Sequence, residues 1–182
     1  MSKALYWGRL TISKMIETSR LILKPLTHNQ LLKYIKDDHS LEKEFHLLPT
    51  KKNIAPELQE ALQQTILPNV FDKDKDSLYH TLWTIISKPD NRMVGDICFV
   101  GEPDPNGEIE IGYGTYEEFR GKGFMTEAVG RILQWAKEQP KVRSVFAATT
   151  KDNVASYSIL EKNGFTHIGE VDDMLSWKIE LK

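Results

Sequence analysis

Residues 116–128 read Tyr116-Glu117-Glu118-Phe119-Arg120-Gly121-Lys122-Gly123-Phe124-Met125-Thr126-Glu127-Ala128. Just before this stretch, apolar and polar residues alternate over residues 108–115, which is typical of a strand. From about Gly123 to Glu138, apolar residues recur at helical spacing instead. Two glycines therefore frame a lysine where a strand pattern gives way to a helix pattern. This order of strand, glycine-rich loop and helix predicts an α/β domain.

The backbone and the side chains of this loop together indicate an anion site. Gly121 and Gly123 permit a curl in which successive N–H groups point into one concavity. The following helix adds unpaired N–H groups and the positive end of its dipole, and Arg120 and Lys122 supply full positive charges. The loop matches neither the Walker A motif nor the dinucleotide-binding G-x-G-x-x-G motif. Two interpretations stay open: a binding site for a pyrophosphate, and a turn whose glycines only permit tight geometry.

Outward from the loop, the sequence predicts one mixed sheet with helices on its faces. Turn-forming residues at 103–107 predict that the strand at 108–115 returns antiparallel to the strand before it. Pro68 is expected to end one helix, and residues 71–77, which alternate Asp and Lys, are expected to form a solvated loop. Predicted strands cover residues 19–25, 80–87, 92–100, 108–115, 142–149, 165–171 and 174–181. Predicted helices cover residues 27–38, 40–47, 56–68 and 123–138, and a segment that Asn153 caps and Gly164 ends.

Length and composition indicate a single globular domain. The chain has 182 residues, of which 40% are hydrophobic and 27% charged, and its formal net charge is −2. That charge balance gives no long-range attraction to nucleic acid or to an anionic membrane. No apolar run approaches the roughly 18 residues that span a bilayer. We expect the domain at residues 15–182, with residues 1–14 as a tail or an extra strand.

The cysteine and histidine content gives no sign of a disulfide or a metal site. Cys98 is the sole cysteine, so no intrachain disulfide can form, and a cytoplasmic, reducing compartment is the simplest expectation. It lies in an apolar run, Ile97-Cys98-Phe99-Val100, where a buried hydrophobe is favoured over a nucleophile. The five histidines lack ligand spacing, so no metal is expected. Arg9 interrupts the apolar core that a signal peptide would need, so export is not expected.

Four segments resemble one enzyme superfamily. Residues 120–125, Arg-Gly-Lys-Gly-Phe-Met, resemble the acetyl-CoA signature R/Q-x-x-G-x-G/A of the GNAT superfamily of N-acetyltransferases. Met125 departs from that signature, which has Gly or Ala at its last position. Three further segments resemble the RimJ/RimL-like branch, which acetylates the N-termini of ribosomal proteins. They are residues 17–23, residues 109–113, and residues 153–156 running on to 161–165, so the resemblance spans most of the chain.

This resemblance implies a fold, a cofactor and a reaction. The implied fold is α/β, with a central mixed, mostly antiparallel β-sheet, helices on both faces, and a cofactor cleft between two splayed parallel strands. The implied cofactor is acetyl-CoA, whose acetyl group passes directly to an attacking amine. The implied pyrophosphate contacts are Arg120, Gly121, Lys122, Gly123, Phe124, Met125 and Thr126. The implied pantetheine arm lies between the parallel strands, where a backbone N–H in the stretch Tyr113, Gly114 and Thr115 polarises the carbonyl.

Glu110 is the candidate general base. Glu108 and Glu110 lie two residues apart on a predicted strand, so both side chains project from one face, opposite Ile109 and Ile111. A carboxylate near the acceptor can take the amine proton directly or through water. The RimJ/RimL-like pattern places its glutamate at Glu110, and Glu108 is expected to be solvated. The alternative, that both residues are only the polar face of a half-buried strand, stays open.

Ser156 is the candidate partner of the departing thiolate. Many members of the superfamily carry a tyrosine acid seven residues after Asn153, but Leu160 stands there in this chain. The RimJ/RimL-like pattern instead places a serine at Ser156, whereas Tyr157 is a weaker candidate. Bonding of Ser156 back to its own helix is the open alternative. Asn153 is expected both to cap this helix and to contact the cofactor, and a bulge at residues 112–114 is expected to splay the strands.

These observations predict an acetyl-CoA-dependent N-acetyltransferase whose acceptor is an amine. The resemblance suggests a protein N-terminal α-amine, and residues 27–70 are expected to line the acceptor side. Two alternatives stay open: a transferase for another acyl-CoA or a small-molecule amine, and a non-catalytic regulator that binds acyl-CoA. The second alternative rests on the departures from the family pattern at Met125 and Leu160. No nucleic acid or membrane partner is expected, and a homodimer stays open.

Overall fold

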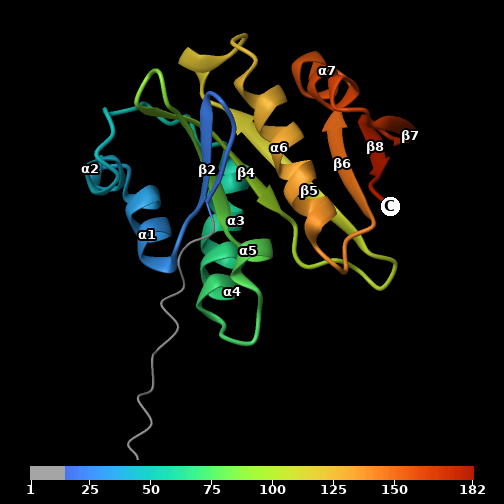
Figure 1. Cartoon of the computed structure of the whole chain (residues 1–182), viewed down its shortest axis with the longest axis horizontal. Helices are drawn as coiled ribbons and strands as arrows, with labels where there is room; N and C mark the ends of the chain where they lie inside the picture. The colour runs from blue at the N-terminus through green and yellow to red at the C-terminus, as the bar shows by residue number, and fades with distance from the viewer. Residues whose placement is uncertain (1–14) are drawn as a thin grey trace, which may run out of the picture.

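A computed structural model of the chain describes residues 15–182, and a mixed sheet runs through the middle of it (Figure 1). Its strands are β1 (Ile16–Glu17), β2 (Leu21–Pro25), β3 (Leu82–Ser87), β4 (Arg92–Phe99), β5 (Glu108–Thr115), β6 (Ser144–Thr150), β7 (Thr166–Val171) and β8 (Met174–Glu180). They follow one another across the sheet in the order β1-β2-β3-β4-β5-β6-β8-β7. All neighbouring strands are antiparallel except β5 and β6, which are parallel. The tail or extra strand expected at residues 1–14 lies outside the described residues.

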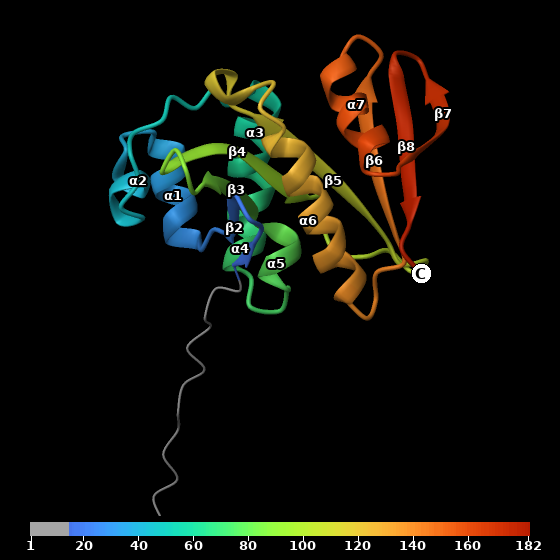
Figure 2. The same cartoon turned by 45° about the horizontal axis from the view of Figure 1, so that its top comes forward.

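Helices cover both faces of this sheet, as the resemblance implies. They are α1 (His28–Lys36), α2 (Ser40–Glu44), α3 (Pro56–Ala61), α4 (Leu67–Phe71), α5 (Ser77–His80), α6 (Phe124–Glu138) and α7 (Val154–Lys162), with a π-helical turn η1 (Leu62–Ile66) and a short 3-10 helix η2 (Glu117–Phe119). Tyr34 of α1 hydrogen-bonds to Asp96 of β4, whereas Trp135 of α6 packs on Trp83 of β3. Trp83 pairs with Ile97, the neighbour of Asp96. Because successive side chains of a strand point to opposite faces, α1 and α6 lie on opposite sides of the sheet, and Figure 2 shows α7 on the other side of β5 from α1.

Local sequence signals determine where α1 and α6 begin. Thr27 caps α1, because its hydroxyl accepts the N–H of Gln30 while the Gln30 side chain accepts the N–H of Thr27. α6 begins directly after Gly123, whose φ of 75° suits a residue without a Cβ. The boundaries predicted for this helix are confirmed to within one residue. None of the helices in the described part of the chain combines the length and the apolar character needed to cross a bilayer.

The helix predicted to end at Pro68 continues past it, so that prediction is wrong. α3, η1 and α4 follow one another without a break from Pro56 to Phe71. In η1 the N–H of Leu67 donates to the carbonyl of Leu62, five residues earlier. Pro68 then lies in the first turn of α4, where its missing N–H and fixed φ are tolerated. Residues 72–76 form the exposed loop that was predicted at 71–77, whereas Phe71 ends α4 and Ser77 begins α5.

An aromatic cluster holds α6 against the sheet. The Trp135 ring lies 5.3 Å from Trp83, 5.5 Å from Tyr79 and 5.3 Å from Phe99, measured between ring centroids. Both tryptophans are buried. Burial of side chains this large stabilises a fold by roughly 1.5–3 kcal/mol each. The cluster therefore holds in place the helix whose N-terminus adjoins the glycine-rich loop.

Candidate active site

The parallel strands β5 and β6 are paired over a short stretch and then diverge (Figure 2). The paired residues are Glu108 with Ser144, Ile109 with Val145, and Glu110 with Phe146. Beyond Glu110, β5 stays paired with β4, and beyond Phe146, β6 stays paired with β8. Within the described residues, the facing edges of β5 and β6 therefore have no strand partner past this point. The expected splaying of two parallel strands is confirmed, and we call the space that opens between them the β5–β6 gap.

The bulge predicted at residues 112–114 is wrong. The register between β4 and β5 advances evenly, from Ile111 opposite Phe99 to Thr115 opposite Gly95. A register shift lies instead between β3 and β4, opposite residues 85–86. β5 thus remains a regular strand along β4, while β6 follows β8 along its whole length. Each strand therefore keeps its outer partner beyond the point where the two separate, and the pairing of β5 with β4 contains no irregularity.

This even register determines which backbone groups of β5 face the β5–β6 gap. The carbonyl of Glu110 accepts a hydrogen bond from the residue after β4, and the N–H of Tyr116 donates to β4. Backbone groups of alternate residues point to the same edge of a strand. The N–H groups of Tyr113 and Thr115 therefore point toward the gap, whereas the N–H of Gly114 points toward β4. Two of the three residues predicted to polarise the carbonyl are oriented for that role.

The loop after β5 has the curled conformation that its glycines permit. Gly121 and Gly123 have φ values of 74° and 75°, a region in which other residues are strained. No atom lies within 4 Å of the position that a Cβ of Gly121 would take, so that side of the loop is open. Within the described residues, the N–H groups of residues 121–126 donate to no acceptor. The first turn of α6 and the loop before it therefore present a group of free donors.

Two exposed cations lie beside these free N–H groups. Arg120 Nε donates to the carbonyl of Thr115 at 3.4 Å, which ties this arginine to the edge of β5 that faces the gap. Lys122 Nζ lies 4.8 Å from the centroid of the Phe119 ring. Free N–H groups, the N-terminus of a helix and two cations form a donor set suited to a pyrophosphate.

Met125 does not obstruct this donor set. Its side chain is buried, and Met125 Cε lies 3.1 Å from the position that a Cβ on Gly95 of β4 would take. The side chain thus points into the protein and packs on β4. Phe124 is likewise buried, while Thr126 is half-buried. The departure from the family signature at Met125 therefore leaves the backbone N–H groups accessible.

Tyr113 and Ser156 meet across the β5–β6 gap. The Ser156 hydroxyl donates to the Tyr113 hydroxyl at 3.2 Å, and the Tyr113 hydroxyl donates to the backbone carbonyl of Ser156 at 3.0 Å. Ser156 is therefore bonded to β5 rather than back to its own helix. Asn153 caps α7 as expected, since its side chain accepts the N–H of Ser156 at 3.1 Å. Burial raises the pKa of Tyr113 to about 12, so its hydroxyl keeps its proton.

The sequence analysis disfavoured two other residues near the gap, Tyr157 as the thiolate partner and Cys98 as a nucleophile. Tyr157 stacks on Trp177, with ring centroids 6.2 Å apart, so it serves packing between α7 and β8. Cys98 is a half-buried residue of β4, and burial raises the pKa of its thiol to about 11. A thiol that holds its proton so firmly is a poor nucleophile, in agreement with the sequence interpretation.

Glu110 lies where β5 and β6 begin to diverge. Its side chain projects from the face of β5 opposite to that of Tyr113, because the two residues are three apart on a strand. Burial, followed by the negative charge of Glu108, raises the pKa of Glu110 above its ordinary value. Glu108 is half-exposed and forms an ion pair with Lys178, 2.9 Å from Nζ to Oε2, so it is more constrained than a freely solvated residue. The gap thus has a carboxylate on one face and two hydroxyls on the other.

Sequence reasoning missed a buried polar cluster beside this site. Asp96 of β4 pairs with Gly114 of β5, and its Oδ2 accepts hydrogen bonds from the hydroxyls of Tyr34 and Tyr116, each at 2.6 Å. Burial raises the pKa of Asp96 to about 6, even though both hydroxyls act to lower it. The sequence did contain a signal for this cluster, because Asp96 lies in an otherwise largely apolar strand. A carboxylate that is buried in such a strand must find hydrogen-bond partners.

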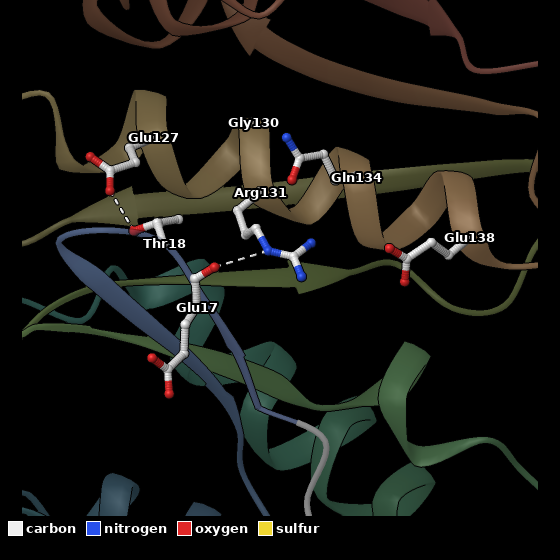
Figure 3. Close-up of a pocket in the computed structure, with 7 residues that line it drawn as sticks. All are labelled: Glu17, Thr18, Glu127, Gly130, Arg131, Gln134 and Glu138. Atoms are coloured by element: carbon white, nitrogen blue, oxygen red, sulfur yellow. Dashed lines mark hydrogen bonds between the residues drawn. The ribbon is translucent and has the colours of Figure 1, made fainter.

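A hollow of about 420 Å³ lies away from the β5–β6 gap, between β1 and α6 (Figure 3). Glu17 and Thr18 line it from the side of β1, and Glu127 and Arg131 line it from α6. Arg131 donates to the carbonyl of Glu17 at 3.1 Å, and Thr18 donates to Glu127. Its walls are mainly polar and form bonds that join β1 and the turn after it to α6, so we assign it no part in the candidate site.

Comparison with known proteins agrees with this geometry. A model of the acetyltransferase (GNAT) domain matches residues 20–166. Among curated proteins, the uncharacterized N-acetyltransferase YjdG of Bacillus subtilis (strain 168) is 32% identical over 154 residues, which is 83% of this chain and 89% of that relative. The range matched by the family model, residues 20–166, contains both β5 and the glycine-rich loop.

Solved structures of similar fold include enzymes that act on a ribosomal protein. RimL, a ribosomal L7/L12 alpha-N-protein acetyltransferase in complex with coenzyme A, has a TM-score of 0.65 and 18% identity, covering 92% of this chain and 98% of that one. The Salmonella typhimurium acetyltransferase that modifies the N-terminal serine of protein L7/L12 has a TM-score of 0.64 and 19% identity, covering 92% and 99%. At these identities, the likeness shows a shared fold.

Proposed function

The chain belongs to the acetyltransferase (GNAT) family, and from this premise we propose that its acceptor is the α-amine at the N-terminus of a protein. The reaction is transfer of an acetyl group from acetyl-CoA to an amine. The observation that carries the site assignment is the divergence of β5 and β6, with Glu110 on one face of the gap and Tyr113 and Ser156 on the other. Residues 15–182 form the catalytic unit in this proposal, and the cytoplasm is its place of action.

The glycine-rich loop fits the pyrophosphate of acetyl-CoA. Arg120 and Lys122 supply charge, and the open side of Gly121 lets phosphate oxygens approach the backbone closely. The N–H groups of residues 121–126 have no competing acceptor within the described chain. Asn153, at the N-terminus of α7, is assigned to contact the cofactor beside the gap. When bound, acetyl-CoA supplies the acetyl group as an activated thioester.

Glu110 acts in this proposal as the general base. An amine attacks only in its neutral form, so a proton must leave the acceptor. A carboxylate whose pKa is raised by burial and by Glu108 accepts a proton more readily than an ordinary glutamate. Glu108 is held by Lys178 and takes no part. The N–H groups of Tyr113 and Thr115, which point toward the gap, stabilise the negative charge that develops on the carbonyl oxygen.

Ser156 acts as the hydrogen-bond donor that stabilises the leaving thiolate, which then takes its proton from solvent, and Tyr113 holds Ser156 in place. The Tyr113 hydroxyl keeps its proton and donates a hydrogen bond to the Ser156 carbonyl, which anchors the first turn of α7 to β5. The Ser156 hydroxyl, which donates to Tyr113 in the absence of substrate, turns its proton toward the sulfur. This arrangement supplies a hydrogen-bond donor for the thiolate although Leu160 replaces the tyrosine usual in the family.

The N-terminal α-amine is favoured as the acceptor by the enzymes that share this fold. One solved relative in fold modifies the N-terminal serine of protein L7/L12, and another is named as an alpha-N-protein acetyltransferase. An α-amine has an ordinary pKa of about 8, well below that of a lysine side chain, so a glutamate base suffices to deprotonate it. Small-molecule amines remain the rival class of acceptor.

A pair of peptides tests this acceptor class. Both carry the same sequence with one internal lysine, but one has a free N-terminus and the other an acetylated one. With acetyl-CoA, we expect acetylation of the free N-terminus, located by mass spectrometry, and no turnover of the blocked peptide. Acetylation of lysine in both peptides, or turnover of small amines alone, would contradict the proposed acceptor while leaving acetyl transfer intact.

A further inference from the structure

Arg20, the residue directly before β2, contacts the glycine-rich loop and the helix that follows it. Its Nε donates to Glu127 Oε2 at 2.7 Å, and its Nη2 lies 2.6 Å from the same oxygen. Its Nη1 donates to the backbone carbonyl of Lys122 at 3.3 Å. Its guanidinium carbon lies 5.1 Å from the centroid of the Phe124 ring. The Arg20 side chain thus touches three residues of the loop and of the first turn of α6.

Glu127 is held by a second residue from the same turn. The Thr18 hydroxyl donates to Glu127 Oε1 (Figure 3), and it accepts the N–H of Leu21 at 2.8 Å. Both carboxylate oxygens of Glu127 are therefore bonded to residues 18–20. Although burial raises the pKa of Glu127, the hydrogen bonds from Thr18 and Arg20 lower it below its ordinary value, so the carboxylate is ionised.

The bond to Lys122 determines which way one peptide unit of the loop is turned. In a trans peptide the carbonyl and the N–H point in opposite directions. Because the Lys122 carbonyl points toward Arg20, the N–H of Gly123 points away from Arg20, and it has no acceptor within the described residues. Gly121 and Gly123 have the most conformational freedom of any residue type, so this orientation needs an outside restraint. A Cβ on Gly123 would lie only 3.7 Å from Arg20 Nη2, which shows how closely the arginine covers that side.

We propose that Arg20 is a positioning residue for cofactor binding, which holds the peptide between Lys122 and Gly123 so that its N–H faces the pyrophosphate. The planar guanidinium contacts Glu127 and the Lys122 carbonyl at once, which a single ammonium group does less well. This inference rests on the proposed pyrophosphate site. It also gives a role to residues 17–23, a segment that resembles the family but that contributes no residue to the proposed catalytic steps.

The test compares Arg20→Met with Arg131→Met, because both arginines tie the N-terminal strands to α6. Arg131 donates to the carbonyl of Glu17 (Figure 3), and within the described residues it forms no hydrogen bond or ion pair with the loop. The affinities of acetyl-CoA and of S-acetylpantetheine, which lacks the pyrophosphate, are measured by calorimetry for each protein. We expect Arg20→Met to weaken acetyl-CoA binding by about tenfold, as for the loss of one hydrogen bond to a charged group, and to leave S-acetylpantetheine unaffected. Arg131→Met is expected to change neither affinity.

A role of Arg20 in general stability would give a different pattern. Equal weakening of both thioesters by Arg20→Met, or an unchanged affinity for acetyl-CoA, would overturn the inference. Arg20→Lys retains the positive charge but not the planar guanidinium that contacts Glu127 and the Lys122 carbonyl at once. Full recovery of acetyl-CoA affinity in Arg20→Lys would therefore also overturn the inference. If Arg20→Met does not fold, Thr18→Val, which removes one bond to Glu127, replaces it with the same expected selectivity and a smaller effect. Wild type that binds both thioesters equally would instead contradict the pyrophosphate site itself, so the two failures are distinguishable.

Discussion

The two halves of the sheet differ in how they are buried, and the candidate site lies where they separate. In the N-terminal half, β3 is buried along its whole length and β4 almost so, between α1 on one face and α6 on the other. In the C-terminal half, β7 is exposed at all but one of its positions. Only the short β5–β6 pairing joins the halves within the described sheet. The difference indicates a firmly packed half that supplies Glu110 and the loop, and a lightly packed half that supplies Ser156.

This contrast explains how the site is divided between the halves. Glu110, Tyr113 and the glycine-rich loop are attached to the packed half, whose aromatic cluster holds α6. Ser156 is carried by α7, and its bonds to Tyr113 cross the gap between the halves. The packed half should therefore set stability and cofactor affinity, and the bond across the gap should set the rate.

The largest expected effect is on stability, from replacing a core tryptophan of the packed half. Trp135→Ala removes the centre of the aromatic cluster and should lower the free energy of unfolding by about 3–5 kcal/mol. Val171→Ala, on the exposed strand β7, should change it by less than about 0.5 kcal/mol. Urea denaturation followed by circular dichroism measures both. Similar losses in the two variants would show that the halves do not differ as described.

The next effect is on catalysis, from Glu110→Gln. Loss of a general base should lower kcat by about a hundredfold or more, with the dissociation constant of acetyl-CoA unchanged. Glu108→Gln is the matched control on the same face, and its half-exposed ion pair with Lys178 contributes little. Because the pKa of Glu110 is raised, the wild-type rate should rise with pH above the range of an ordinary glutamate, and this rise should be absent in Glu110→Gln. Equal rates in the two variants would remove Glu110 from the mechanism.

A smaller effect is expected from the buried Asp96 in the packed half. Its pKa is raised to about 6, so between the ordinary carboxyl value and 6 the folded protein binds the proton more tightly than the unfolded chain. Its protonation therefore stabilises the fold at low pH, and this stabilisation is lost as pH rises through about 6. Asp96→Asn removes the titration, so the difference in unfolding free energy between about pH 4 and about pH 8 should shift by about 2 kcal/mol relative to wild type, in favour of the variant at the higher pH. An unchanged pH profile in urea denaturation would show that Asp96 is ionised in both states.

The smallest expected effect is on kcat, from removing the hydroxyl of Ser156 or of Tyr113, which meet across the β5–β6 gap. Ser156→Ala and Tyr113→Phe should each lower kcat by about tenfold, since each removes a bond of about 1–2 kcal/mol. The double variant should be little worse than Ser156→Ala alone, because Tyr113 acts through Ser156 and has nothing to position once the Ser156 hydroxyl is gone. Steady-state rates at saturating acetyl-CoA provide the measurement. Additive losses would mean that the two hydroxyls act separately.

Features that depend on local sequence were predictable, and features that depend on distant contacts were not. The start of α6 and the curl of the loop followed from Gly121 and Gly123 together with helical spacing, and Asn153 caps its helix as expected. The π-turn that lets a helix run past Pro68 gives no periodic signal of its own. The partner of Ser156 lies on a strand 43 residues away, and no spacing rule within α7 could indicate it.

The direct test of the account is calorimetric titration of the full chain with acetyl-CoA and with S-acetylpantetheine, repeated on Arg120→Ala. We predict that wild type binds acetyl-CoA at least about tenfold more tightly than the thioester without the pyrophosphate, and that Arg120→Ala loses much of this preference. Equal affinity of wild type for the two thioesters, or binding of neither, would contradict the assignment of the loop at residues 120–126 as the pyrophosphate site.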